Sequence, residues 1–153
     1  MTKTTNQQTQ TGDSKNIQIS IPGNPQSKIR PRILKSGRSY TPKHAKDAEN
    51  FIKETATLSL MGQTLPIYSK ETGLALEISF FMPIPGSWSK KKQKLALEGQ
   101  LTHTSRPDVD NLVKLVKDAL NEITYKDDSQ IAVLMASKQY SDTPRTEVKI
   151  FPI

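Results

Sequence analysis

The sequence contains no cysteine, only two histidines and a single tryptophan. Without thiols, the chain can form neither disulfide bonds nor cysteine-ligated zinc sites. With only His44 and His103 available, a metal site built on histidine is not expected either. No apolar run approaches the roughly 20 residues that a membrane-spanning helix needs, and the N-terminus lacks the apolar region of a secretory signal. We therefore expect a soluble, cytoplasmic protein without a membrane partner.

Acidic residues are missing from one long stretch, residues 28–46, which carries seven basic side chains. A second basic block, residues 90–94, follows Trp88, and the whole chain has a formal net charge of +7. Such a charge favours an anionic partner, most often nucleic acid. The first block is interrupted by proline and glycine rather than spread along a helix face, so we predict that it contacts phosphates. The lysine block taken alone is equally typical of a solvated surface.

Large apolar side chains are absent from residues 2–16, so residues 1–16 are expected to form a disordered polar tail. Residues 17–153 suffice for one domain with a modest core. Alternating apolar residues predict strands at 17–21, 74–82, from 131 onward and around 148–150. Helical spacing predicts helices over about 42–60, 89–99 and 109–123, the first with apolar positions Ala48, Phe51, Ile52, Thr55 and Leu58. The order β-α-β-α-α-β-β predicts an α+β domain with a mixed or antiparallel sheet packed with helices.

Carboxylates are concentrated in residues 108–128, which hold six acidic and three basic residues in an otherwise basic chain. A protein that attracts a polyanion has little electrostatic reason to gather repelling carboxylates in one place. Holding a divalent metal ion against a phosphate is such a reason, because Mg²⁺ prefers oxygen ligands and usually binds through one or two carboxylates, water and substrate phosphate. The pattern therefore indicates a nuclease or phosphoryl-transfer site.

Helical spacing places Asp110, Lys114 and Asp118 on one face of the helix, opposite its apolar stripe. Asp108 converges with Asp110 only if the chain is still extended at Asp108. One residue of the pair Asp127-Asp128 would complete the site if the following strand runs beside the start of the helix. Ordinary alternatives exist for each residue: a helix N-cap for Asp108 or Asp110, a surface ion pair for Lys114, and a turn for the aspartate pair.

The run Asp108-Val109-Asp110-Asn111-Leu112-Val113-Lys114 is followed by Asp118-Ala119-Leu120 and Asp127-Asp128-Ser129-Gln130-Ile131. Upstream lie Lys28-Ile29-Arg30-Pro31-Arg32, Arg38-Ser39-Tyr40-Thr41-Pro42, Pro83-Ile84-Pro85-Gly86-Ser87-Trp88-Ser89 and His103-Thr104. Together these segments closely resemble the RusA family of Holliday-junction resolvases. The similarity covers the chain from about Ile17 to Ile150.

The resemblance implies that Asp108, Asp110 and Asp128 are catalytic aspartates that bind Mg²⁺, with Asp127 as the alternative third ligand. It implies that Lys114 is the catalytic lysine, and we expect Asp118 to support it. It also implies a homodimer whose two active sites nick four-way junction DNA symmetrically in recombination and repair. The predicted DNA-binding residues are Lys28, Arg30, Arg32, Arg38, Lys43, Lys90, Lys91, Lys92, His103 and Arg106. The competing hypothesis is a non-catalytic branched-DNA-binding protein, against which the presence of all the expected ligands argues.

Overall fold

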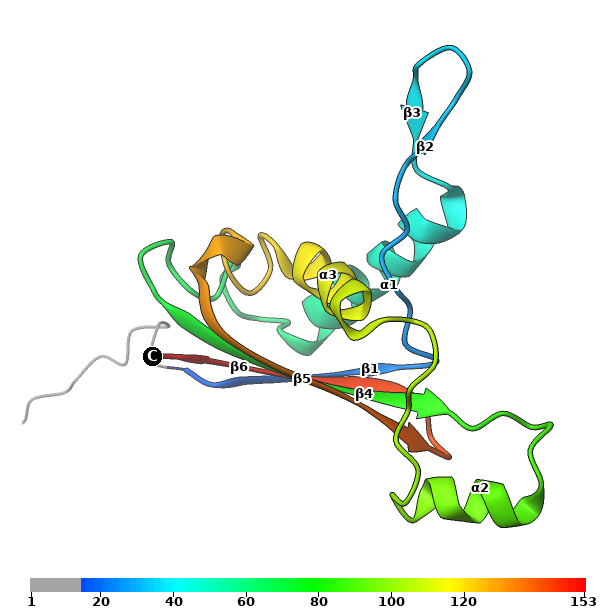
Figure 1. The fold of residues 1–153 in the computed structure, drawn as a ribbon. Coiled ribbons are helices and arrows are strands. Elements are labelled where there is room, and N and C mark those ends of the chain that lie inside the picture. Colours follow the sequence, from blue (N-terminus) through cyan, green and yellow to red (C-terminus); the bar gives the residue numbers. More distant parts are fainter. Residues whose placement is uncertain (1–14) are drawn as a thin grey trace, which may run out of the picture.

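A four-stranded sheet carries two helices on one face in the computed structural model, which describes residues 15–153 (Figure 1). The strand order is β1-β6-β4-β5, with β1 (Ile17–Pro22), β4 (Leu74–Pro83), β5 (Ile131–Ser141) and β6 (Arg145–Pro152). β6 pairs antiparallel with both β1 and β4, whereas β4 and β5 run parallel. The sheet is therefore mixed, and the link from β5 to β6 passes the end of β4.

The helices are α1 (Lys43–Ser59), α2 (Lys90–Leu97) and α3 (Val109–Leu120), followed by a short 3-10 turn, η2 (Asp128–Gln130). α1 and α3 lie together over the sheet, whereas α2 stands on the other side of it near the ends of β4 and β5 (Figure 1). Ser87 and Ser89 were both candidate caps for α2, and it is the Ser89 side chain that caps the helix by accepting a hydrogen bond from the Lys92 backbone N–H. These elements confirm the predicted α+β class and element order.

The core lies between the sheet and the two helices. β1 and β4 alternate as expected, so that one side chain in two faces the helices. α3 supplies the largest helical contribution and buries six of its twelve residues. The buried residues of α3 are Leu112, Val113, Leu115, Val116, Ala119 and Leu120. The stripe leaves the opposite face of α3 to charged side chains, which is where the predicted site residues lie.

The structure differs from the sequence-based expectation in two details of α1 and adds one element that was not predicted. α1 begins at Lys43, with Pro42 as its N-cap residue, rather than at Pro42. It buries Ala45, Ile52 and Ala56, whereas Phe51 and Leu58 are 46% and 65% exposed. The covering surface is narrower than the helix's apolar stripe, because α1 packs chiefly against β1 and α3. The sequence also gave no indication of a two-stranded hairpin, β2 (Arg32–Ile33) with β3 (Ser39–Tyr40), inside the basic segment.

Most of the predicted tail, residues 1–14, lies outside the described residues. Within residues 15–153, no helix is both long and apolar enough to cross a membrane.

Candidate active site

The start of α3 presents two carboxylates to solvent. Asp108 occupies the N-cap position in an extended conformation, with φ −68° and ψ 145°, as the predicted convergence with Asp110 requires. Its side chain nevertheless makes no capping hydrogen bond. Within residues 15–153, no ion pair or side-chain hydrogen bond engages either Asp108 or Asp110, and both residues are exposed. The ordinary N-cap alternative therefore does not account for Asp108, and both carboxylates are available to a ligand.

The segment that leads into α3 is held in place by a lysine from β5. Lys138 Nζ donates hydrogen bonds to the backbone oxygens of Ser105, at 2.8 Å, and Pro107, at 3.0 Å. Both acceptors lie within three residues of Asp108. The last part of β5 thus fixes the direction from which the chain enters α3, and sequence reasoning had not identified Lys138.

Lys114 and Asp118 form the predicted pair on the exposed face of α3. Lys114 Nζ lies 3.2 Å from Asp118 Oδ1, while the other carboxylate oxygen of Asp118 lies 3.1 Å from Lys28 Nζ. Lys28 also pairs with Glu49 of α1, at 3.6 Å. Exposed pairs of this kind contribute little stability. The ion pair instead fixes where the Lys114 side chain points, because Asp118 holds the Lys114 ammonium on the exposed face of α3.

Lys28 is engaged in structure rather than free for phosphate. Partial burial by itself lowers the pKa of Lys28, but the hydrogen bond to Asp118 and the charges of Glu49 and Asp118 raise the pKa overall. The Lys28 backbone N–H also donates to the Asn111 oxygen, at 2.9 Å. The chain is therefore pinned to the first turn of α3 at this point.

Two buried side chains set the position of the segment after α3. The Tyr125 hydroxyl donates to the Lys117 oxygen of α3, at 2.8 Å, and burial together with the nearby carboxylates raises the pKa of Tyr125, so that it remains a donor. Gln130 accepts from the backbone N–H groups of Lys126 and Asp127 and donates to the backbone oxygens of Ser69 and Thr72. The turn that carries the aspartate pair is thus joined to the end of α3 and to residues 69–72.

The two aspartates of that pair have different roles. Asp127 caps η2: its carboxylate accepts hydrogen bonds from the hydroxyl and backbone N–H of Ser129, which lower the pKa of Asp127. The turn alternative is therefore confirmed for Asp127. Asp128 makes no capping bond, and its carboxylate faces Lys117 Nζ at 4.0 Å. Of the two, Asp128 has the carboxylate that is better placed to bind a ligand.

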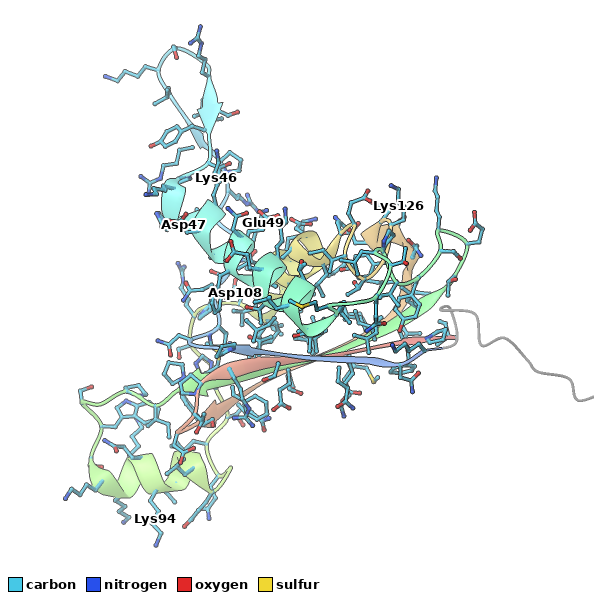
Figure 2. The ribbon with its side chains drawn as sticks, turned by 180° about the vertical axis from the view of Figure 1, so that it is seen from behind. Lys46, Asp47, Glu49, Lys94, Asp108 and Lys126 are labelled. Atoms are coloured by element: carbon cyan, nitrogen blue, oxygen red, sulfur yellow. The ribbon has the colours of Figure 1, made fainter. Side chains whose placement is uncertain are left out.

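The three predicted metal ligands do not converge in one chain. Asp128 lies beside Lys117 in the last turn of α3, whereas Asp108 precedes the first turn. Asp110 and Lys117 are seven residues apart, which is about 10 Å along a helix axis. Figure 2 likewise shows Asp108 well apart from Lys126, which precedes the aspartate pair. Within residues 15–153, no group of three or more acidic or histidine side chains could hold a metal ion. The described residues therefore show no three-carboxylate pocket, and the ligand set Asp108, Asp110 and Asp128 stays a prediction.

The predicted DNA-binding residues lie on separate surfaces. Arg32 and Arg38 are exposed on the β2–β3 hairpin, Arg30 is exposed just before it, and Lys43 is exposed where α1 begins. The lysines of α2 lie on the opposite side of the sheet, as the positions of Lys46 and Lys94 in Figure 2 show. Among them, Lys90 and Lys91 are exposed, and Lys92 sits over the Trp88 ring with its Nζ 4.0 Å from the centroid.

Near the start of α3, Arg106 is exposed but His103 is not. His103 is only 8% exposed and packs against Tyr140, with ring centroids 4.8 Å apart. Burial and the charge of Lys138 lower the pKa of His103, which favours the neutral imidazole. Its surroundings are those of a packed side chain rather than of an accessible DNA contact.

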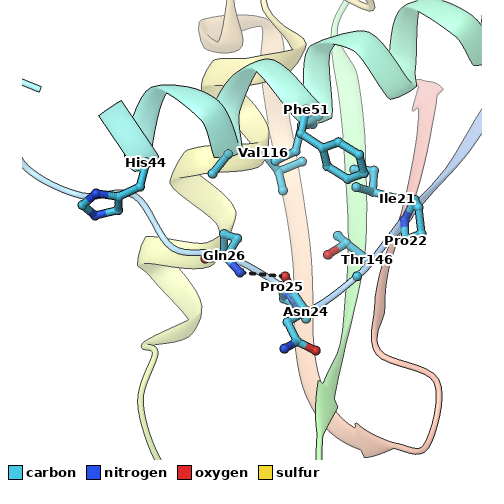
Figure 3. A pocket seen from close by; sticks show the side chains of 12 residues that line it. Ile21, Pro22, Asn24, Pro25, Gln26, His44, Phe51, Val116 and Thr146 are labelled. Atoms are coloured by element: carbon cyan, nitrogen blue, oxygen red, sulfur yellow. Dashed lines mark hydrogen bonds between the residues drawn. The ribbon is translucent and has the colours of Figure 1, made fainter. Parts of the chain in front are cut away.

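A pocket of about 350 Å³ lies between the first half of α1 and the segment after β1 (Figure 3). Its lining includes His44, Phe51 and Val116, but none of the carboxylates of residues 108–128. The cavity is therefore not the predicted site, which lies on the open surface of α3.

The sequence matches the family described as Endodeoxyribonuclease RusA over residues 22–151. The chain belongs to the RusA family. It is 39% identical over 137 residues to YqaN, an uncharacterized protein of Bacillus subtilis (strain 168), across 88% of this chain and 94% of that protein. It is 36% identical over 84 residues to the crossover junction endodeoxyribonuclease rusA of Lactococcus phage r1t, across 54% of this chain and 57% of the phage protein.

The predicted resemblance is thereby confirmed, and the chain is an endodeoxyribonuclease of the RusA family. RusA nucleases are metal-dependent in general. The match includes α3, the aspartate pair and the basic hairpin, since all of them lie within residues 22–151.

Proposed function

We propose that this RusA-family chain resolves Holliday junctions by paired, symmetric, Mg²⁺-dependent nicks, acting in the cytoplasm in DNA recombination and repair. One observation carries the proposal: two unpaired carboxylates, Asp108 and Asp110, stand at the exposed start of a helix in a strongly basic nuclease. The name of the phage relative supports the choice of a four-way junction as the substrate.

In this proposal Asp108 and Asp110 hold the divalent ion together with water and a substrate phosphate, which suits the one or two carboxylates that Mg²⁺ usually takes from a protein. The ion would activate a water nucleophile and stabilise the leaving oxygen. Lys114, one turn along the same face, offsets negative charge that develops on the phosphate. Asp118 keeps the Lys114 ammonium on this face through their ion pair, at 3.2 Å.

The role of Asp128 as third ligand rests on the resemblance, since one chain holds this carboxylate beside Lys117. The capping side chain of Asp127 is less suited to the role, because its Oδ2 already accepts two hydrogen bonds from Ser129. Asp128→Asn and Asp127→Asn therefore make an informative pair of variants. Loss of cutting in the first and not in the second would support Asp128 as the catalytic residue.

Dimerisation is part of the same proposal, and the edge of the sheet offers the contact. β5 has a neighbouring strand on one side only, and its residues Val133, Leu134 and Met135 are 44–47% exposed. An edge strand with adjacent exposed apolar residues can pair with a strand of another chain. Proteins that do not pair in this way usually protect such an edge with charged residues, proline or a covering element. Pairing of two β5 edges around a twofold axis would bury the same residues from both copies.

The decisive experiment incubates the purified chain with a mobile four-way junction and Mg²⁺ and maps the nicks on every strand. The expected result is paired nicks on strands of like polarity, with little cutting of Y-shaped or linear duplex DNA and none in EDTA. Asp108→Asn is expected to keep junction binding and abolish cutting, and Lys114→Ala to cut about 10²-fold more slowly. Asp142→Asn, at an exposed aspartate in the β5–β6 link, is the matched control. Wild-type nicking rates in Asp108→Asn would refute the site assignment.

A further inference from the structure

The β2–β3 hairpin stands away from the body of the protein as an arm (Figure 1). Every residue from 30 to 40 is exposed. The tip is a well-formed turn, since the Leu34 N–H donates to the Arg38 oxygen at 2.8 Å and the Gly37 N–H donates to the Leu34 oxygen at 2.9 Å. Gly37 has φ +83°, the left-handed conformation that closes a three-residue hairpin loop of this kind. The arm is therefore an ordered projection that buries nothing of its own.

The base of the arm is fixed to the helix that carries the candidate active site. Lys28 donates its backbone N–H to Asn111 in the first turn of α3 and pairs with Asp118 on the exposed face of α3. The arm ends where α1 begins, and α1 packs against α3. Its direction is thus set relative to Asp108 and Asp110, so a substrate held by the arm has a defined position with respect to the site.

Two large apolar side chains lie at the tip between cationic ones. Ile33 is 79% exposed and Leu34 is 48% exposed, and Ile33 has the largest exposed fraction of the exposed apolar residues within residues 15–153. In the hairpin register Arg32 lies opposite Tyr40, and Ile33 lies opposite Ser39. Successive strand residues point to opposite faces, so one face carries Arg32 with Tyr40 and the other carries Ile33. Lys35 and Arg38 flank the turn itself.

We infer that this arm is a wedge: Ile33 on one face of the tip and Leu34 on the other insert between base pairs at the branch point of the DNA, while Arg32 and Arg38, on the Leu34 face, bind the neighbouring phosphates. The inference rests on the proposed function for its branched substrate. The arm carries no acidic residue between Lys28 and Lys46, which favours a polyanion over a second copy of this basic chain. Apolar wedges of isoleucine and leucine unstack base steps in several DNA-binding proteins. At a branch point the cost is lower, because continuous stacking is already interrupted there.

The test uses the full chain bound in EDTA to an immobile four-way junction that carries 2-aminopurine beside the branch point. Wild-type protein is expected to raise the fluorescence, because the base becomes unstacked. The double variant Ile33→Thr/Leu34→Ser keeps the arginines, so it is expected to retain binding within about one order of magnitude and to lose the fluorescence rise. Arg32→Gln/Arg38→Gln is expected to weaken binding and to lower the slope of log affinity against log salt by about two.

Met61→Gln is the matched control, since Met61 is 74% exposed and lies just beyond α1, away from the arm. An equal fluorescence rise with wild type and with Ile33→Thr/Leu34→Ser overturns the wedge. The wedge is also overturned if the double variant differs from wild type in solution mass but gives the same fluorescence rise. That result would assign the tip to contact between copies. Nick mapping in Mg²⁺ separates the two proposals. A wild-type chain that cuts junctions without unstacking refutes the wedge alone, and one that unstacks without cutting refutes the proposed nuclease mechanism alone.

Discussion

Replacing Gln130 by alanine should unfold the turn that carries Asp128 and destabilise the whole domain. The Gln130 side chain is 9% exposed and makes four hydrogen bonds of 2.8–3.1 Å, two as acceptor and two as donor. At about 1 kcal/mol net for each bond, and with water able to reach some of the freed groups, the loss should be roughly 2–4 kcal/mol of unfolding free energy. For a domain of this size that lowers Tm by about 6–15 °C.

Thermal unfolding followed by circular dichroism measures this change, with Gln18→Ala at an exposed position of β1 as the matched control. Gln130→Glu separates the two halves of the network. It keeps an acceptor for Lys126 and Asp127 but sets a carboxylate oxygen against the backbone oxygens of Ser69 and Thr72, so at neutral pH it should be at least as destabilised as alanine and should recover stability when the glutamate is protonated. A Gln130→Ala protein within about 1 °C of wild type would show that these bonds are exchanged for water at no cost, and would refute the reasoning.

Three further outcomes follow from the geometry. Leu134→Lys should make the protein monomeric in sedimentation experiments, because it puts a charge on the exposed β5 edge. Leu97→Lys on α2 is the control and should leave the dimer intact. A monomeric wild-type protein would rule out β5 as a dimer contact. Lys138→Met should slow nicking several-fold, because Lys138 holds the segment leading into α3. Lys149→Met is the control and should nick at the wild-type rate. Equal nicking rates in the two variants would show that Lys138 has no positioning role. The pKa of Asp127 is lowered in the folded protein by the Ser129 hydrogen bonds, so ionised Asp127 stabilises the fold above its usual pKa of 3.8, and this contribution is lost as the pH falls through the lower folded value. The stability difference between wild type and Asp127→Ala should therefore vanish in strongly acidic solution, and a difference independent of pH would contradict it.

Much of the site could be predicted, because the spacing of nearby residues determines which side chains share a helix face. Asp110, Lys114 and Asp118 share a face through the helical repeat alone, and the Lys114–Asp118 ion pair follows from it. The extended conformation at Asp108 meets the condition that the sequence set for its convergence with Asp110. The position of Asp128 beside Lys117 could not be predicted, because it depends on Tyr125 and Gln130 binding backbone groups on other segments. Gln130 was visible in the family-like motif, but its partners at Ser69 and Thr72 lie about sixty residues away.

The same division applies to the fold. Strict alternation identified β1 and β4, and the apolar stripe identified α3, because each pattern reflects burial along a single element. α1 was less well described, since which part of a stripe is covered depends on what packs against it. The β2–β3 arm is too short for any periodic signal, and only its turn and the anchoring of Lys28 reveal it.

By itself the sequence determined the absence of thiol chemistry, the basic character of the chain, the α+β order and the RusA motifs, all of which are properties of composition or of neighbouring residues. Only the tertiary structure decided that β5 is an open edge, that Asp127 is a cap while Asp128 faces Lys117, and that Ile33 stands at the tip of a basic arm. These features depend on which distant segments come together, and that is fixed by the packing of α1 and α3 on the sheet rather than by any local pattern.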